Sequence, residues 1–251
     1  MGAVKSTGVT GTAQRGSAVA GTVVDFNPAG GGGGGNFYLQ EDWTTGQTGN
    51  LSTQATPIVS DGDWVGAGSN GPALTNFLFY TPPTVGHSVL RYSHGSKFGV
   101  GMVLAPALGY DEYVHTVVFI SSWIQGWNGS NRDWGIAFNS NAAGTEYYSV
   151  RVNAIGLKLY RNGTQLGSTT AISPWSHATQ DYTISATVSG GDIDILFTNV
   201  TLGQTKTISV TDSTYMDATH NYMGVYGSSQ SFGYSTEWGG HWPATVETVP
   251  L

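Results

Sequence analysis

A tryptophan-rich segment, residues 123–134, carries residue types suited to sugar chemistry. Sugar sites place a flat aromatic ring under the pyranose ring, while amide and carboxylate groups bind the hydroxyls. The candidate carbohydrate-binding residues are Trp127, Asn128, Arg132 and Asp133. In the alternative interpretation, Trp123 and Trp134 are core residues at the ends of strands.

Other chemistries lack their usual residues. The six histidines show neither an HExxH pattern nor another tight metal spacing, and no GxSxG segment is present. The sequence contains no cysteine. Asp61-Gly62-Asp63 offers two carboxylates, whereas Ca²⁺ takes about six to eight oxygen ligands, so we interpret it as a turn. We expect no metal and no cofactor.

The segment Glu146–Ile172 is the clearest structural signal in the chain. Buried-type and polar residues alternate with a period of two, first over 148–152 and again over 157–160. Asn153–Gly156 offers a turn, and Asn162-Gly163 is the dipeptide most suited to a tight hairpin. The segment therefore predicts an antiparallel meander of three strands.

About a dozen short strands are predicted over the whole chain. The run Val117–Ile120 is apolar at every position, which is typical of a strand at the centre of a covered sheet. We expect one helical turn at Tyr215–Thr219 and little other helix. We expect the last strand at Gly233–Trp238, with a short tail to Leu251. Many short strands joined by turns indicate a β-sandwich or barrel.

Composition excludes several classes of partner. Only 10% of the 251 residues are charged, and the formal net charge is −7 with nine Lys and Arg. A nucleic-acid partner requires clustered cations, so we expect none. No apolar run is long enough to span a membrane. The N-terminus lacks the apolar core of a signal peptide.

Residues 1–35 differ from the rest and predict an extended N-terminal arm, with a β-sandwich domain over residues 36–251. The arm contains 11 glycines and ends in the run Gly30–Gly35. Such a segment cannot bury enough apolar surface to order itself alone, so we expect it to lie against other subunits. The candidate anchoring residues are Val4, Val9, Val19, Val23, Val24 and Phe26.

Four segments resemble the concanavalin A-like lectin/glucanase (laminin-G-like) family, whose fold is an antiparallel jelly-roll β-sandwich. They are LQEDWTTGQTGNLSTQATPIVSDGDWVGAGSNG, DWGIAFNSNAAGTEYYSVRVNAIGLKLYRNGTQLGSTT, DYTISATVSGGDIDILFTN and MGVYGSSQSFGYSTEW. The resemblance covers residues 37–240 and implies that the last of these segments closes the sheet near the first strand. Domains of this family often decorate the virions of tailed phages.

The glucanase branch of the family carries Glu-x-Asp-x-Glu on one strand. The nearest match here is Asp192-Ile193-Asp194-Ile195-Leu196, in which Leu196 replaces the acid/base residue. We therefore expect Asp192 and Asp194 to face solvent, and we expect no enzyme activity.

Two main functional hypotheses remain open. The first is a non-enzymatic virion structural protein, a phage capsid decoration or tail component that the arm anchors to other virion subunits. In this hypothesis the chain forms a homo-oligomer and is assembled in the host cytoplasm. The alternative is a carbohydrate-binding, lectin-like or receptor-binding module that contacts surface glycans. A polysaccharide-degrading enzyme is the third and weakest hypothesis.

Overall fold

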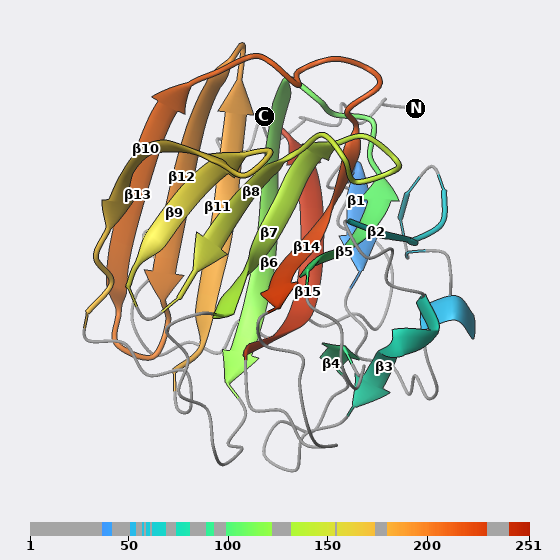
Figure 1. The fold of residues 1–251 in the computed structure, drawn as a ribbon, viewed down its shortest axis with the longest axis horizontal. Coiled ribbons are helices and arrows are strands. Elements are labelled where there is room, and N and C mark those ends of the chain that lie inside the picture. Colours follow the sequence, from blue (N-terminus) through green and yellow to red (C-terminus); the bar gives the residue numbers. More distant parts are fainter. Residues whose placement is uncertain are drawn as a thin grey trace, which may run out of the picture. The chain divides into compact units, whose positions relative to one another are not determined.

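Two antiparallel sheets pack face to face in the computed structural model of the chain (Figure 1). The structure describes residues 37–41, 51–53, 57, 59–60, 62–68, 74–80, 89–92, 99–121, 132–153, 155–173, 180–229 and 241–251. In this part of the chain, no helix is long and apolar enough to cross a membrane.

The first sheet has six strands, which lie in the order β1-β15-β6-β11-β12-β13. All neighbouring strands in it are antiparallel. The strands are β1 (Leu39–Glu41), β15 (His241–Pro250), β6 (Glu112–Ser121), β11 (Tyr182–Ser189), β12 (Asp192–Asn199) and β13 (Gln204–Thr211).

The second sheet has seven strands, which lie in the order β10-β9-β8-β7-β14-β5-β2. They are β10 (Thr164–Thr170), β9 (Leu157–Arg161), β8 (Tyr148–Val152), β7 (Arg132–Ser140), β14 (Tyr222–Ser229), β5 (Gly99–Pro106) and β2 (Val65–Ala67). A further two-stranded antiparallel sheet pairs β3 (Phe77–Tyr80) with β4 (Val89–Tyr92), and two short 3-10 helices, η1 and η2, cover Leu51–Thr53 and Leu74–Asn76.

The predicted meander is confirmed at the edge of the seven-stranded sheet. Strands β8, β9 and β10 pair in sequence, and the hairpin between β9 and β10 turns at Asn162 and Gly163. These two residues have φ angles of 48° and 85°, which is the left-handed conformation that a tight hairpin requires.

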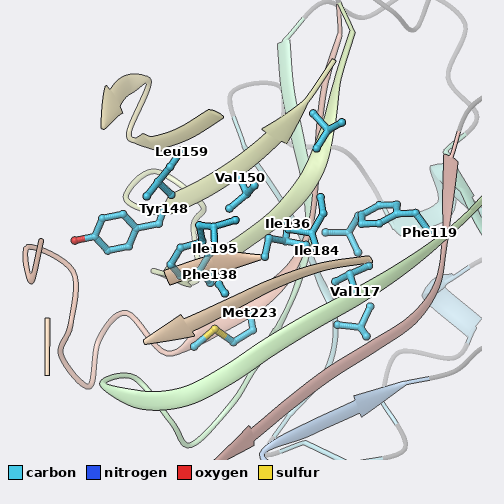
Figure 2. Close-up of a cluster of buried hydrophobic side chains, with 14 of the residues drawn as sticks. Val117, Phe119, Ile136, Phe138, Tyr148, Val150, Leu159, Ile184, Ile195 and Met223 are labelled. Carbon is cyan, nitrogen blue, oxygen red and sulfur yellow. The ribbon is translucent and has the colours of Figure 1, made fainter. Parts of the chain in front are cut away.

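Alternating side chains from both sheets form the core. Val117, Ile184 and Ile195 of the six-stranded sheet are fully or almost fully buried, as are Ile136 and Val150 of the seven-stranded sheet. Figure 2 shows side chains from both sheets gathered in one cluster. Burying one such side chain stabilises the fold by roughly 1.5–3 kcal/mol. The buried side chains between the two sheets are therefore a main source of the stability of the sandwich.

Two structural predictions are wrong. Residues 241–250 form β15, which pairs with both β1 and β6, although we expected only a tail there. Its sequence contains two prolines, and Pro243 lies where the register with β6 shifts, a position that tolerates a proline. The segment 215–219 contains turns and bends in place of the expected helical turn.

The chain segment predicted to close the sandwich lies elsewhere. Residues 222–229 form β14 inside the seven-stranded sheet, between β7 and β5, and do not pair with β1. The predicted last strand, residues 233–238, lies outside the described residues. The apolar run in β6 was placed correctly, because β6 lies inside the six-stranded sheet with Val117 and Phe119 fully buried.

Candidate functional site

The seven-stranded sheet has one face against the core and one face with charged and aromatic side chains. Along β8, Val150 and Val152 belong to the core, whereas Arg151 between them is only partly buried. Because side chains alternate along a strand, Ser149 and Arg151 share the opposite face. We call this the outer face; its other polar and aromatic residues include Asp133 of β7, Lys158 and Tyr160 of β9, and Tyr226 of β14.

The guanidinium group of Arg151 lies between two tyrosine rings. Its Cζ atom is 3.9 Å from the ring centroid of Tyr160 and 4.6 Å from that of Tyr226. Its Nε–H donates a hydrogen bond of 3.1 Å to the hydroxyl oxygen of Ser149. A guanidinium within about 6 Å of a ring face is attracted by the ring. The three contacts therefore hold this cation in a fixed orientation on the sheet.

Gly135 lies between Arg151 and Tyr226 in the sheet. In the strand register, Gly135 of β7 pairs with Arg151 on one side and with Tyr226 on the other. A Cβ atom at Gly135 would lie 1.7 Å from the backbone oxygen of Val150, so a larger residue does not fit. Arg151 thus reaches the ring of Tyr226 across β7 at a position that has no side chain.

A second cation lies beside the first on the outer face. Lys158 of β9 is the register partner of Arg151. Among the described residues, the ion pairs involve only Arg161 and His220, and neither Arg151 nor Lys158 takes part in one. Like charges that face each other across two strands repel. Two of the chain's nine Lys and Arg residues are therefore adjacent on this face, which also carries Asp133; among the described residues Asp133 forms no ion pair with either cation.

A turn of the chain covers another part of the outer face. Six residues make a small apolar cluster there: Ala67, Met102, Leu104, Ala137, Tyr147 and Tyr226. A Cβ atom at Gly144, in the turn before β8, would lie 2.5 Å from the side chain of Ala67. This turn thus packs onto β2 and β5, whereas Arg151, Lys158 and Tyr160 all remain partly exposed.

One of the four predicted sugar-binding residues lies on this face. Asp133 has the same strand parity as Gly135, and its Oδ1 atom accepts a hydrogen bond of 2.5 Å from Nδ2 of Asn153. Arg132 is the first residue of β7, but its side chain is outside the described part of the structure. Trp127 and Asn128 also lie outside the described residues, as do the six candidate anchoring residues of the arm.

Sequence patterns alone did not point to Arg151, Lys158, Tyr160 or Tyr226. Arg151 and Lys158 occupy the polar positions of the alternating meander, and alternation alone indicates only that such positions face away from the core. The signal that could have found them was the placement of two cations on consecutive strands in a chain with few cations.

A polar network ties the edge of the seven-stranded sheet to the segment that follows β13. Asp212 accepts hydrogen bonds from the Tyr148 hydroxyl at 2.6 Å and from Nη1 of Arg161 at 2.5 Å. In Figure 2 the hydroxyl oxygen of Tyr148 points away from the labelled core side chains. Burial raises the pKa of Tyr148, and the bond to Asp212 raises it further. Although burial alone would raise the pKa of Asp212, the bonds from Tyr148 and Thr214 lower it.

A second polar cluster surrounds His220. Its Nδ1 atom lies 2.9 Å from Oδ1 of Asp217, and its Nε2 atom lies 3.3 Å from Oε2 of Glu146. Hydrogen bonds from Thr219 and His220 lower the pKa of Asp217 to about 2. The described residues include no group of three or more His, Asp or Glu side chains placed to hold a metal ion. We interpret this cluster as a structural contact that joins the turn containing Glu146 to the turn containing Asp217 and His220.

The two aspartates of the glucanase-like pattern lie on the six-stranded sheet. Asp192 and Asp194 are exposed on β12, and they alternate with the buried Ile193 and Ile195. The exposed face also carries Leu196, which is 41% exposed. Oδ1 of Asp192 accepts a hydrogen bond of 2.6 Å from Thr211. The prediction that both carboxylates face solvent is confirmed.

Comparisons with solved structures agree with this architecture. The exoplasmic/lumenal domain of VIP36, in a form with bound Ca²⁺ and Man, superposes with a TM-score of 0.52 at 10% identity, over 85% of this chain and 90% of that one. Lectin UEA-II complexed with galactose superposes with a TM-score of 0.51 at 12% identity, over 86% and 99%. No family model matches the sequence, and no curated protein matches it. The chain thus has the concanavalin A-like lectin fold.

Proposed function

We propose that the chain is a carbohydrate-binding module that binds sugars on the outer face of the seven-stranded sheet. The observation that carries the proposal is the guanidinium of the partly exposed Arg151, held between the partly exposed Tyr160 and the fully buried Tyr226. A planar group with five N–H donors is well suited to the closely spaced oxygens of a sugar. Tyr160 adds a rigid, partly exposed ring with little conformational entropy to lose, whereas the buried Tyr226 supports the guanidinium from within the fold.

The fold supports this proposal over the virion hypothesis. VIP36 and lectin UEA-II, which share the fold, have been solved with bound Man and galactose. At 10–12% identity this likeness concerns the fold alone, so the outer-face residues must carry the functional argument. The virion hypothesis depends on residues 1–35, and no observation within the described residues bears on it. It remains a prediction.

We also propose that the module has no catalytic activity. A retaining glycosidase needs two carboxyl groups about 5–5.5 Å apart, one as the nucleophile and one as the acid/base. On β12, Asp192 and Asp194 have only Leu196 at the third position. Incubation with β-glucans and alginate, followed by a reducing-sugar assay, should show no cleavage above a blank; release of reducing ends would contradict this proposal.

A glycan array tests the binding proposal. The full chain should bind a defined group of glycans, and Tyr160→Ala should lose most of the signal because one support of the Arg151 guanidinium is removed. Thr207→Ala is the matched control, since Thr207 is exposed on the six-stranded sheet, away from the outer face. If the chain binds no glycan, or if both variants bind like the wild type, the outer face is not a sugar site.

A further inference from the structure

We infer that the outer face selects acidic glycans, and that Arg151 and Lys158 together bind the carboxylate or sulfate of one sugar unit. This inference rests on the proposed carbohydrate-binding function and specifies its ligand class. Three properties of the outer face support it: the N–H donors of Arg151 that make no hydrogen bond among the described residues, the position of Lys158 and the local character of the charge.

Within the described part of the chain, most N–H donors of Arg151 make no hydrogen bond. Among the described residues, its guanidinium makes one hydrogen bond, from Nε to the Ser149 hydroxyl. The two tyrosine rings lie against the guanidinium and accept no conventional hydrogen bond in its plane. A carboxylate or sulfate matches the remaining N–H donors, because a guanidinium binds such groups through two parallel hydrogen bonds.

A neighbouring arginine shows the contrast. Arg161, also in the meander, has its own carboxylate partner, with Nη1 2.5 Å from Oδ2 of Asp212. Arg151 has no such ion pair among the described residues. On the same face, Asp133 accepts a hydrogen bond from Asn153. Within the described part of the fold, Arg161 is therefore paired with a carboxylate, whereas Arg151 has none and can bind the acidic group of a ligand.

Lys158 adds a second positive charge at the same place. Its position directly opposite Arg151 places two cations side by side, an arrangement that disfavours the free protein. An anionic group bound between the two side chains would convert this repulsion into two attractions. A neutral sugar would leave the repulsion in place. The pair of cations therefore favours an acidic over a neutral ligand.

The positive charge of the outer face acts only over a short range. The whole chain carries a formal net charge of −7, so it does not attract long polyanions from a distance. At physiological ionic strength, charges farther apart than about 8 Å are largely screened. The two cations consequently act on one nearby anionic group. This limits the ligand to a glycan with a discrete acidic unit and disfavours nucleic acid, which requires more phosphate contacts.

Matched pairs of glycans test the inference. Oligogalacturonate and its carboxyl-reduced form differ only in the carboxylates, and a sulfated heparin tetrasaccharide can be compared with its desulfated form. Titration calorimetry with the full chain should show at least roughly tenfold tighter binding of one acidic member. Lys158→Gln should reduce that preference several-fold, and Arg151→Gln should reduce it at least about tenfold. Lys206→Gln, on β13 of the other sheet, is the control and should leave the preference unchanged.

The possible outcomes separate this inference from the proposed function. Equal binding of acidic and neutral members, still lost in Tyr160→Ala, would overturn the acidic preference and leave the sugar-binding face intact. An acidic preference that survives in both Lys158→Gln and Arg151→Gln would overturn the assignment of these residues. Binding to no glycan at all would overturn both proposals. Circular dichroism of each variant identifies any that fails to fold. If Arg151→Gln does not fold, Lys158→Gln, which changes a partly exposed residue, still tests the acidic preference.

Discussion

Nε2 of His115 lies 3.1 Å from the backbone oxygen of Gly224, and this hydrogen bond joins the two sheets through the core. Because a carbonyl oxygen only accepts, Nε2 carries the proton. Nδ1, 2.9 Å from the Thr248 hydroxyl, then accepts from it. His115 is fully buried, and burial lowers its pKa from 6.5 to about 4, against smaller opposite effects of its interactions with the backbone of Gly224 and Glu247. The histidine is thus a neutral structural link.

This link should make stability depend on pH. In the unfolded chain His115 takes up a proton below pH 6.5, whereas in the folded protein it does so only near pH 4. The unfolded state therefore binds more protons between these values, and the free energy of unfolding should fall as the pH is lowered from 6.5 to 4. The expected loss is on the order of 3 kcal/mol.

Urea unfolding at pH 7, 5.5 and 4.5 measures this loss. His115→Gln should be less stable at pH 7 but should lack most of the slope between pH 6.5 and 4. The effect of Asp217, whose pKa is lowered from 3.8 to about 2, lies below this window. A slope in His115→Gln equal to that of the wild type would assign the pH dependence to other groups.

Asp212→Asn should destabilise the fold by about 1–2 kcal/mol at pH 7, because Arg161 loses its ion pair and Tyr148 loses a charged acceptor. The value is modest since the Arg161 side chain is 34% exposed. Because the pKa of Asp212 is lowered, the stabilising contribution of Asp212 should depend on pH. It is fully present above the carboxyl's ordinary pKa of 3.8 and is lost as the pH falls below that value. Asp194→Asn, on an exposed position, is the control and should change stability by less than about 0.5 kcal/mol. Equal effects of the two substitutions in urea unfolding would refute the role of the network.

Two adjacent residues of β12 test which face of the six-stranded sheet is the core. Ile195 is 1% exposed and Leu196 is 41% exposed. Ile195→Ala should reduce the free energy of unfolding by about 2–5 kcal/mol, because it removes buried methyl groups and leaves a cavity. Leu196→Ala should reduce it by less than about 1 kcal/mol. Thermal unfolding of both variants gives the comparison, and a larger effect at Leu196 would reverse the assignment of the faces.

Gly135→Ala should be among the most damaging small substitutions in the chain. Its Cβ atom would lie 1.7 Å from the backbone oxygen of Val150, so β7 and β8 would have to separate. We expect a loss of about 3 kcal/mol or more, or no folded protein. Gly190→Ala is the control: Gly190 has φ 57° and nothing would lie within 4 Å of its added Cβ atom, so only the left-handed backbone cost of about 1–2 kcal/mol applies. Denaturant midpoints that rank the two variants in the opposite order would refute the close approach.

The strands of the fold were largely predictable because their signals are local. The meander at 148–170 follows from alternation and from Asn162-Gly163, and both depend on neighbouring residues alone. The strand 241–250 was missed because its prolines argue against a strand unless the bulge at Pro243 is known, and that bulge depends on pairing with the distant β6. The family resemblance indicated the sandwich correctly, but it assigned the strand beside β1 to residues that form β14, and β15 takes that place.

Most residues of the candidate site could not be predicted from the sequence. Arg151, Gly135 and Tyr226 meet because β14, from a distant part of the chain, pairs with β7, which in turn pairs with β8. Only the register reveals that Gly135 lies between the other two residues. Asp133 was selected for its neighbours in the tryptophan-rich segment, and it lies on the same face as Arg151. Neither composition nor spacing distinguishes a cation on a solvent face from one held between two rings.

The most direct test of sugar binding on the outer face is a nuclear magnetic resonance titration with a glycan that the array identifies. We predict that ligand-induced amide shifts concentrate at residues 149–151, 158–160 and 226, on the outer face. The amides of residues 194–196 and 205–209, on the six-stranded sheet, should remain unchanged. Shifts confined to the six-stranded sheet, with the outer face unaffected at saturation, would contradict the proposed site.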